Sequence, residues 1–150
     1  MASQRSLTIN STDLRMTRSA IFDTSILIDQ IRSNRFSSKI PLVTGPIRLS
    51  SVVLAELERG AVTKLDAEVI RALAKNQKII TPTEKIWIES GQILATMRND
   101  RGLEPTKLRD LHFDVLIALT ARSCGACLIT SNRKDSELIR SYRDFELEIW

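Results

Sequence analysis

Short apolar runs alternate along the chain with longer stretches of helical periodicity, beginning at Ser19. Runs of this length, bounded by polar residues, are typical of buried strands, and they predict strands over residues 20–22, 47–49, 78–80, 126–130 and 145–150. The stretches between them predict helices over residues 25–35, 51–60, 66–76, 83–102 and 112–124, with a short helix from Asp135. Such alternation predicts an α/β fold with a short-stranded, mainly parallel sheet covered by helices on both faces.

Capping residues and helix-breaking residues set the predicted boundaries. Ser51 and Asp66 are good N-caps for the second and third helices, and Gly60 ends the second. A loop is predicted over residues 39–46, which include two prolines and a glycine. We interpret Glu104-Pro105 as a break before the helix over residues 112–124.

Residues 1–17 differ from the rest of the chain. They are rich in Ser, Thr and Asn, and only Leu7 and Ile9 show a brief alternation that would suit an edge strand. We interpret them as an N-terminal extension of unknown role, with Met16 as an alternative start of translation. Residues 18–150 are then predicted to form a single domain.

Composition excludes several classes of protein. No apolar stretch approaches the roughly 18 to 20 residues that a membrane helix needs. The first 20 residues also lack the apolar segment of a secretory signal, so a cytoplasmic protein is expected. Charged residues make up 27% of the chain and the two signs are interspersed, which argues against disorder. The net charge of +4 is a weak indication of an anionic partner.

The cysteines, the single histidine and the tryptophans do not support a catalytic role. Cys124 and Cys127 have CxxC spacing, but the first would lie at a helix C-terminus, the wrong end to activate a thiol. Tetrahedral zinc needs four ligands, whereas the sequence offers two Cys and one His. We interpret His112, Trp87 and Trp150 as packing residues. No glycine-rich phosphate-binding loop is present.

Four carboxylates stand where a core would have apolar or neutral residues. They are Asp23 at the end of the first predicted strand, Glu56 in the helix after the second, Asp114 inside an apolar helix, and Asp135 after the fourth strand. Glu58 lies about 200° around the helix from Glu56, so only one of the two can share a site. Taken singly, Asp23 and Asp135 could be helix caps, Asp114 a partner of a helix dipole and Glu56 a solvated residue.

Together these carboxylates predict a metal site. Two unit charges 4 Å apart repel by about 4 kcal/mol at an effective dielectric constant near 20. A divalent cation relieves that repulsion, and all-oxygen ligation without His or Cys favours Mg²⁺ or Mn²⁺.

The segments that carry these acids resemble the signature stretches of the PIN domain, in order. They are FDTSILI at residues 22–28, SSVVLAEL at 50–57, DVLIA at 114–118 and LITSNRKD at 128–135. The chain is particularly similar to the VapC-type toxins of bacterial toxin–antitoxin pairs. One departure is Ser136, which follows Asp135 where many relatives have Phe.

The resemblance implies an α/β/α sandwich with metal-dependent endoribonuclease activity that leaves 5′-phosphate and 3′-hydroxyl ends. Asp23, Glu56, Asp114 and Asp135 would be the catalytic, metal-binding acids. Thr24, Ser25, Thr130 and Asn132 would orient them or touch substrate. Implied partners are RNA, a VapB-like antitoxin and a second copy in a homodimer.

Two other readings remain open from the residues. One is a PIN-like module that binds RNA or protein but has lost its chemistry. The other is a phospho-acceptor or phosphatase domain, although the second residue after Asp23 is Ser25, where haloacid-type phosphatases require Asp. The charge balance favours a nuclease, because without the four acids 14 acidic residues face 22 basic ones and the remainder carries +8. Such a surface can hold a phosphate backbone.

Overall fold

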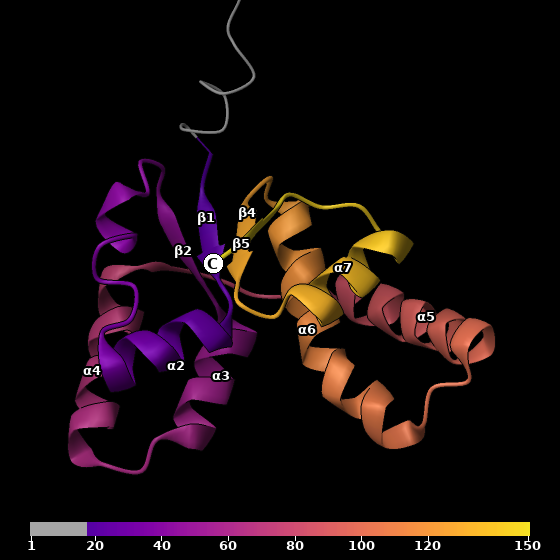
Figure 1. Cartoon of the computed structure of the whole chain (residues 1–150), viewed down its shortest axis with the longest axis horizontal. Helices are drawn as coiled ribbons and strands as arrows, with labels where there is room; N and C mark the ends of the chain where they lie inside the picture. Colours follow the sequence, from indigo (N-terminus) through magenta and orange to yellow (C-terminus); the bar gives the residue numbers. More distant parts are fainter. Residues whose placement is uncertain (1–17) are drawn as a thin grey trace, which may run out of the picture.

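Five parallel strands form the centre of the computed structural model, which describes residues 18–150 (Figure 1). The strands are β1 (Ala20–Phe22), β2 (Ile47–Ser50), β3 (Lys78–Ile80), β4 (Cys127–Thr130) and β5 (Leu147–Ile149). They are hydrogen-bonded in the order β3-β2-β1-β4-β5, and every neighbouring pair is parallel. The prediction of a short-stranded parallel sheet is confirmed, whereas the predictions for residues 1–17 lie outside the described residues.

Helices flank the sheet on both sides. Those described are α2 (Thr24–Ser33), α3 (Ser51–Gly60), α4 (Lys64–Asn76), α5 (Glu84–Arg101), α6 (Pro105–Ser123) and α7 (Arg133–Tyr142), with a 3-10 turn η1 (Ile40–Leu42). Figure 1 shows α2, α3 and α4 on one side of the sheet and α5, α6 and α7 on the other. The chain steps outward from β1 to β3 and then returns to β4, so right-handed crossovers place the two groups on opposite faces. This is the predicted α/β/α layering.

Helix α6 begins earlier than the sequence pattern indicates. The prediction placed its start at His112, but the helix starts at Pro105, with Glu104 as its N-cap. Proline fits the first turn of a helix because the N–H that it lacks would have no partner there. Asp114 therefore lies in the third turn of α6, and its interpretation as a partner of the helix N-terminus is wrong.

Three other helix starts also differ from the prediction. Ser50, not Ser51, caps α3, accepting from the backbone N–H groups of Val52 and Val53 at 3.2 and 3.5 Å. Thr63 caps α4, and Asp66 is the third-position partner in its capping box. Asn132 caps α7, so Asp135 lies at the third helical position and is not an N-cap.

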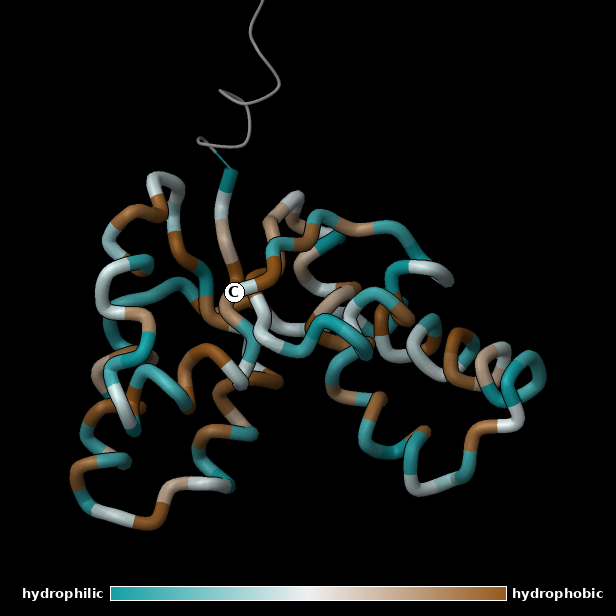
Figure 2. Tube along the Cα trace, in the orientation of Figure 1, coloured by the Kyte–Doolittle hydropathy of each residue, from teal (hydrophilic) through white to brown (hydrophobic). Residues whose placement is uncertain are grey.

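The core fills both faces of the sheet, and a large part of it lies between the central strands and α6. All three residues of β1 are buried, and α6 buries Leu111 and the continuous run from Val115 to Ala121. A helix buried on several sides loses the amphipathic period, which is why the pattern marked only its most apolar part. Figure 2 shows apolar residues concentrated where the strands meet the helices. No described helix is long and apolar enough to cross a membrane.

His112 and Trp150 make packing contacts, as interpreted from the sequence, whereas Trp87 is 47% exposed. His112 Nε2 lies 3.1 Å from Ser90 Oγ, and its ring meets that of Trp87 edge-on at 5.8 Å. Trp150 packs against Phe22 and Phe36, each at 5.5 Å between ring centroids. Cys124 caps the end of α6 and Cys127 begins β4, and within residues 18–150 neither forms a disulfide.

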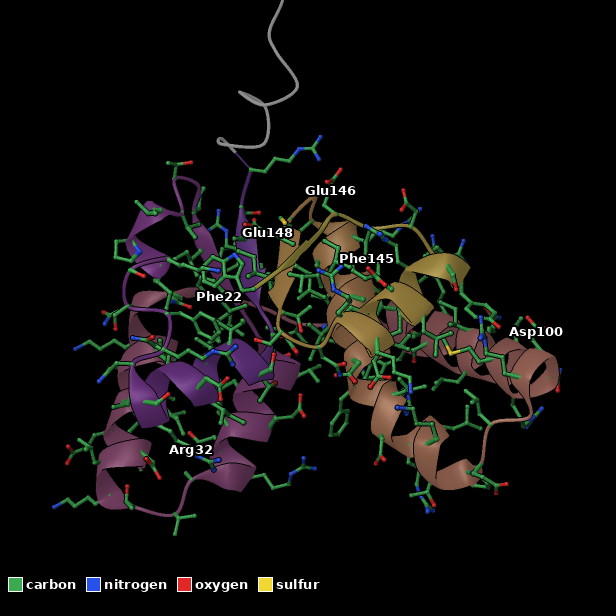
Figure 3. The ribbon with its side chains drawn as sticks, viewed as in Figure 1. Phe22, Arg32, Asp100, Phe145, Glu146 and Glu148 are labelled. Carbon is green, nitrogen blue, oxygen red and sulfur yellow. The ribbon has the colours of Figure 1, made fainter. Side chains whose placement is uncertain are left out.

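The chain enters the sheet through a close backbone contact. Arg18 pairs with Glu146 at 3.1 Å, beside β5, where Glu146 and Glu148 are labelled in Figure 3. Gly45 lies against the same segment, because a Cβ at Gly45 would overlap the Arg18 carbonyl oxygen. Ala20 then donates its N–H to the Pro46 carbonyl at 2.9 Å, which fixes the start of β1.

Replacing Gly45 should therefore weaken the fold. We expect Gly45→Ala to lower the free energy of unfolding by about 1–3 kcal/mol, the usual cost of forcing an extra carbon into a packed position. Gly60→Ala is the matched control, since nothing lies within 4 Å of a Cβ there and Ala favours a helix. Urea denaturation of the two variants measures the difference, and equal stabilities would contradict the contact.

Candidate active site

The four acids come from segments that meet at the carboxyl edge of the sheet. Asp23 directly follows β1, Glu56 lies on α3 after β2, and Asp135 lies on α7 after β4. Strands β2, β1 and β4 are neighbours, so these three positions are adjacent. Asp114 reaches them from α6, and its carboxyl group is acted on by the charges of the other three acids. We refer to Asp23, Glu56, Asp114 and Asp135 as the acidic cluster.

Asp23 is buried and firmly oriented. Only 9% of the residue is exposed, and its Oδ2 accepts hydrogen bonds from Thr130 Oγ1 at 2.8 Å and Ser25 Oγ at 2.9 Å. It occupies the N-cap position of α2, but its side chain makes no capping hydrogen bond. Within residues 18–150 no donor is bonded to Oδ1, which leaves that oxygen available to a ligand.

A second layer of polar side chains ties Asp23 to the loop between β4 and α7. Ser25 Oγ lies 3.3 Å from Thr130 Oγ1 and accepts from the Ser131 N–H at 3.2 Å. Thr130 Oγ1 also accepts from the Asn132 N–H at 3.0 Å. Because Thr130 is fully buried, these bonds hold the loop and the carboxylate in one arrangement.

Glu56 is aimed by Thr24. The Thr24 hydroxyl donates to Glu56 Oε1 at 2.9 Å, while the exposed Arg59 guanidinium lies 4.0 Å from Oε2. Burial raises the pKa of Glu56 above its ordinary value, and the charge of Asp23 adds to this effect against the lowering influence of Thr24 and Arg59. Glu58, two residues along, is exposed.

Asp135 has both oxygens occupied. Lys107 Nζ donates to Oδ1 at 2.9 Å, and Asn132 Nδ2 donates to Oδ2 at 3.1 Å. Burial alone would raise the pKa of Asp135, but these two hydrogen bonds hold it below its ordinary value. Lys107 was missed in the sequence because the predicted helix began after it; with the true start, it falls seven residues before Asp114, on the same helical face.

Asp114 differs from the other acids in having no hydrogen-bond donor among the described residues. Burial raises its pKa to about 7, with further contributions from Asp23, Glu56 and Asp135 that Lys107 only partly offsets. A largely buried carboxyl group without a donor holds its proton more strongly than an exposed one, and a bound cation would favour its ionised form.

A small cavity adjoins Asp23 and Asp114. Its volume is about 10 Å³, room for roughly one water molecule. Ser136 and Asn132 line it together with apolar side chains from α6, β4 and α7. Ser136 stands where many similar sequences have Phe. Because its side chain is much shorter, it leaves space in the cavity behind the acids.

The donor set fits a hard divalent cation, although the side chains are not arranged around one. Among residues 18–150, no three His, Cys, Asp or Glu side chains form a group that could hold a metal ion. Ligation would require these carboxylates to lie closer to one another than they do in the structure. The chemistry fits Mg²⁺ or Mn²⁺, because every donor is a carboxylate oxygen and Asp114 has no other partner.

Comparison with known proteins identifies the family. The model of the PIN domain matches residues 20–140. The chain belongs to the PIN domain family. This PIN domain is similar to the VapBC2 complex of Rickettsia felis bound to a promoter DNA fragment, with a TM-score of 0.68, 26% identity, and 88% of this chain and 98% of that chain covered.

Other toxin–antitoxin structures are also similar to this PIN domain. A complex from Klebsiella pneumoniae gives a TM-score of 0.56 at 25% identity, covering 77% of this chain and 88% of that one. DNA-bound VapBC from Salmonella typhimurium shares the fold, with a TM-score of 0.59 at 24% identity and coverage of 89% and 98%. No curated protein matches the chain significantly. The resemblance to VapC-type PIN domains is thereby confirmed.

The raised pKa of Asp114 predicts an unusual dependence of stability on pH. A carboxyl group whose pKa is higher in the folded protein has no effect on stability at low pH, and it destabilises the fold increasingly as the pH rises from about 4 to about 7, above which the loss is constant. We therefore expect Asp114→Asn to stabilise the metal-free protein relative to the parent, by roughly 2 kcal/mol more at pH 8 than at pH 5. Urea denaturation with EDTA at both pH values measures this difference.

Asp110→Asn is the matched control for that measurement. Asp110 lies four residues earlier on α6 and is exposed, so its replacement should change stability equally little at both pH values. A pH-independent effect of Asp114→Asn would contradict the assignment of Asp114 as the protonated member of the acidic cluster.

Proposed function

We propose that this PIN domain is a metal-dependent endoribonuclease and the toxin of a toxin–antitoxin pair. The observation that carries the proposal is the acidic cluster, in which four carboxylates converge and Asp114 lacks any donor among the described residues. Family membership supports hydrolysis of nucleic acid, because PIN domains are generally nucleases. A degenerate binding module is less well supported, since it has no need to keep four mutually repelling acids.

In the proposed site, the four acids hold Mg²⁺ or Mn²⁺ and their neighbours orient them. Asp23 offers Oδ1, because Thr130 and Ser25 satisfy Oδ2. Thr24 keeps Glu56 directed toward the cluster. When bound, the ion would lower the pKa of a water molecule and place positive charge beside the phosphate of the RNA. Cleavage would leave 5′-phosphate and 3′-hydroxyl ends.

Exposed cations border the acidic cluster and suit an RNA backbone. Arg59 lies beside Glu56, with its guanidinium 5.8 Å from the centroid of the Phe113 ring. Lys134 is exposed next to Asp135 and acts on its charge. We propose that these side chains bind phosphates on either side of the scissile bond, as cations do in other nucleic-acid sites.

Partners are proposed on a separate basis. The similar structures from Rickettsia felis and Salmonella typhimurium are VapBC complexes, which supports a VapB-like antitoxin for this chain. Exposed apolar residues near the start of α5, Trp87 and Ile88, at 47% and 56% exposure, support a homodimer or another protein contact.

Metal-dependent cleavage tests the proposal directly. The purified protein should cut RNA in Mg²⁺ or Mn²⁺ and stop in excess EDTA. Asp23→Asn and Asp114→Asn should each lower the cleavage rate by roughly two orders of magnitude or more, because each removes an ionised ligand. Rates are measured on total RNA and on a labelled oligonucleotide.

Asp110→Asn again serves as the control and should cleave at the parental rate. Circular dichroism and thermal melts establish that the inactive variants are folded. Cleavage that survives both substitutions, or that persists in excess chelator, would disprove the proposed mechanism. Metal binding without cleavage of any RNA would favour the binding module.

The toxin assignment makes a prediction about gene order. We expect a short reading frame encoding a DNA-binding protein beside this gene, and its product should co-purify with the PIN domain and suppress cleavage. A DNA-binding protein of similar size from an unrelated operon is the control. Failure of the neighbouring product to bind or inhibit would remove the toxin assignment and leave the nuclease assignment standing.

A further inference from the structure

One cation lies among the acids that would bind metal. Lys107 Nζ is 2.9 Å from Asp135 Oδ1, and the Lys107 side chain is 40% exposed against 17% for Asp135. Arg59, the other cation that forms an ion pair with a cluster acid within residues 18–150, lies 4.0 Å from Glu56 and has a side chain that is 72% exposed. Lys107 therefore makes the shorter and more sheltered contact.

The position of Lys107 on α6 brings its charge to two acids at once. Seven residues, about two helical turns, separate it from Asp114, so both side chains leave the same face of the helix. From there Lys107 crosses to α7 and bonds Asp135, and its positive charge also acts on Asp114. Lys107 thus acts as a counter-ion for the part of the cluster formed by α6 and α7.

Lys107 and a divalent cation would compete for Asp135, because both are cations and Lys107 already bonds Oδ1. Oδ1 accepts from Lys107 and Oδ2 accepts from Asn132, so neither oxygen is free of a donor. An incoming cation needs one of these oxygens, and it repels the ammonium group that occupies Oδ1. Asn132 also caps α7 through Asp135 N–H at 3.4 Å, so Lys107 is the partner that can leave without disturbing the helix.

We propose that Lys107 is a built-in competitor for the metal, which occupies Asp135 in the ion-free protein and must be displaced before the fourth carboxylate can bind the ion. Lys107 is a positioning residue in this role, since it acts through Asp135. The inference rests on the proposed metal site. It adds that Lys107 lowers the affinity of the site for a divalent cation, because its charge already compensates Asp135.

Metal affinity measured on the whole protein tests the competition without relying on activity. Mn²⁺ is titrated into parental protein, K107Q, K107R and K134Q by calorimetry, and thermal melts are recorded with and without Mn²⁺. K107Q should bind Mn²⁺ about 3- to 10-fold more tightly and gain a larger Mn²⁺-dependent rise in melting temperature. K107R keeps the cation and should bind like the parent.

K134Q is the matched control for charge alone. Lys134 is exposed and acts on Asp135 only at a distance, so its loss should change affinity less than twofold. If K107Q binds Mn²⁺ no more tightly than the parent, or if K134Q gives an equal gain, the competition is disproved. A merely structural ion pair would lower the melting temperature of K107Q equally with and without Mn²⁺.

The controls separate this inference from the proposed function. Mn²⁺ binding that is lost in Asp114→Asn but unchanged in K107Q would leave the metal site standing and overturn the role of Lys107. A parent protein that binds no Mn²⁺ would overturn both.

Discussion

The repulsion among four carboxylates at one edge of the sheet is the constraint on which the site depends. Each acid has a different solution to it. Asp23 receives two hydroxyl donors and Glu56 receives one, whereas Asp135 has an ammonium and an amide. Asp114 receives none among the described residues, and its pKa rises to about 7. The charge that is least compensated belongs to the acid on the most buried helix, where a bound cation would relieve the largest penalty.

Topology explains why these acids meet although they are far apart in the sequence. The order β2-β1-β4 puts the carboxyl ends of three strands side by side. The return from β3 to β4 carries α6 across the opposite face, so Asp114 comes from a different layer than Asp23 and Glu56. Helix α6 also contributes much of the core on its face of the sheet. The same helix therefore carries both buried apolar residues and the cluster residue Asp114.

Most of the fold, and the meeting of the four acid-bearing segments at one edge of the sheet, could be predicted, because buried strands and misplaced charges leave strong local patterns. Asp23 interrupts an apolar run, and Asp114 is charged within another. The beginning of α6 could not be predicted in the same way, since a proline that ends one helix and a proline that begins another look alike without the neighbouring backbone. That error removed Lys107 from the site. The resemblance implied both partners of Asp23, but the hydrogen bond from Thr130 joins residues that are 107 positions apart in the sequence.

The net charge of the chain has two components that act over different distances. Exposed cations such as Lys134 act through solvent, where salt screens them within about 10 Å at 0.1 M, so they would attract an anionic partner without fixing any acid. Lys107 acts at 2.9 Å on a partly buried carboxylate, where screening is weaker. A count of basic residues treats both alike. Burial, and the helical face that Lys107 shares with Asp114, make Lys107 different from the exposed cations. Composition would count its charge toward the attraction of an anionic partner, whereas in the structure that charge compensates the acidic cluster.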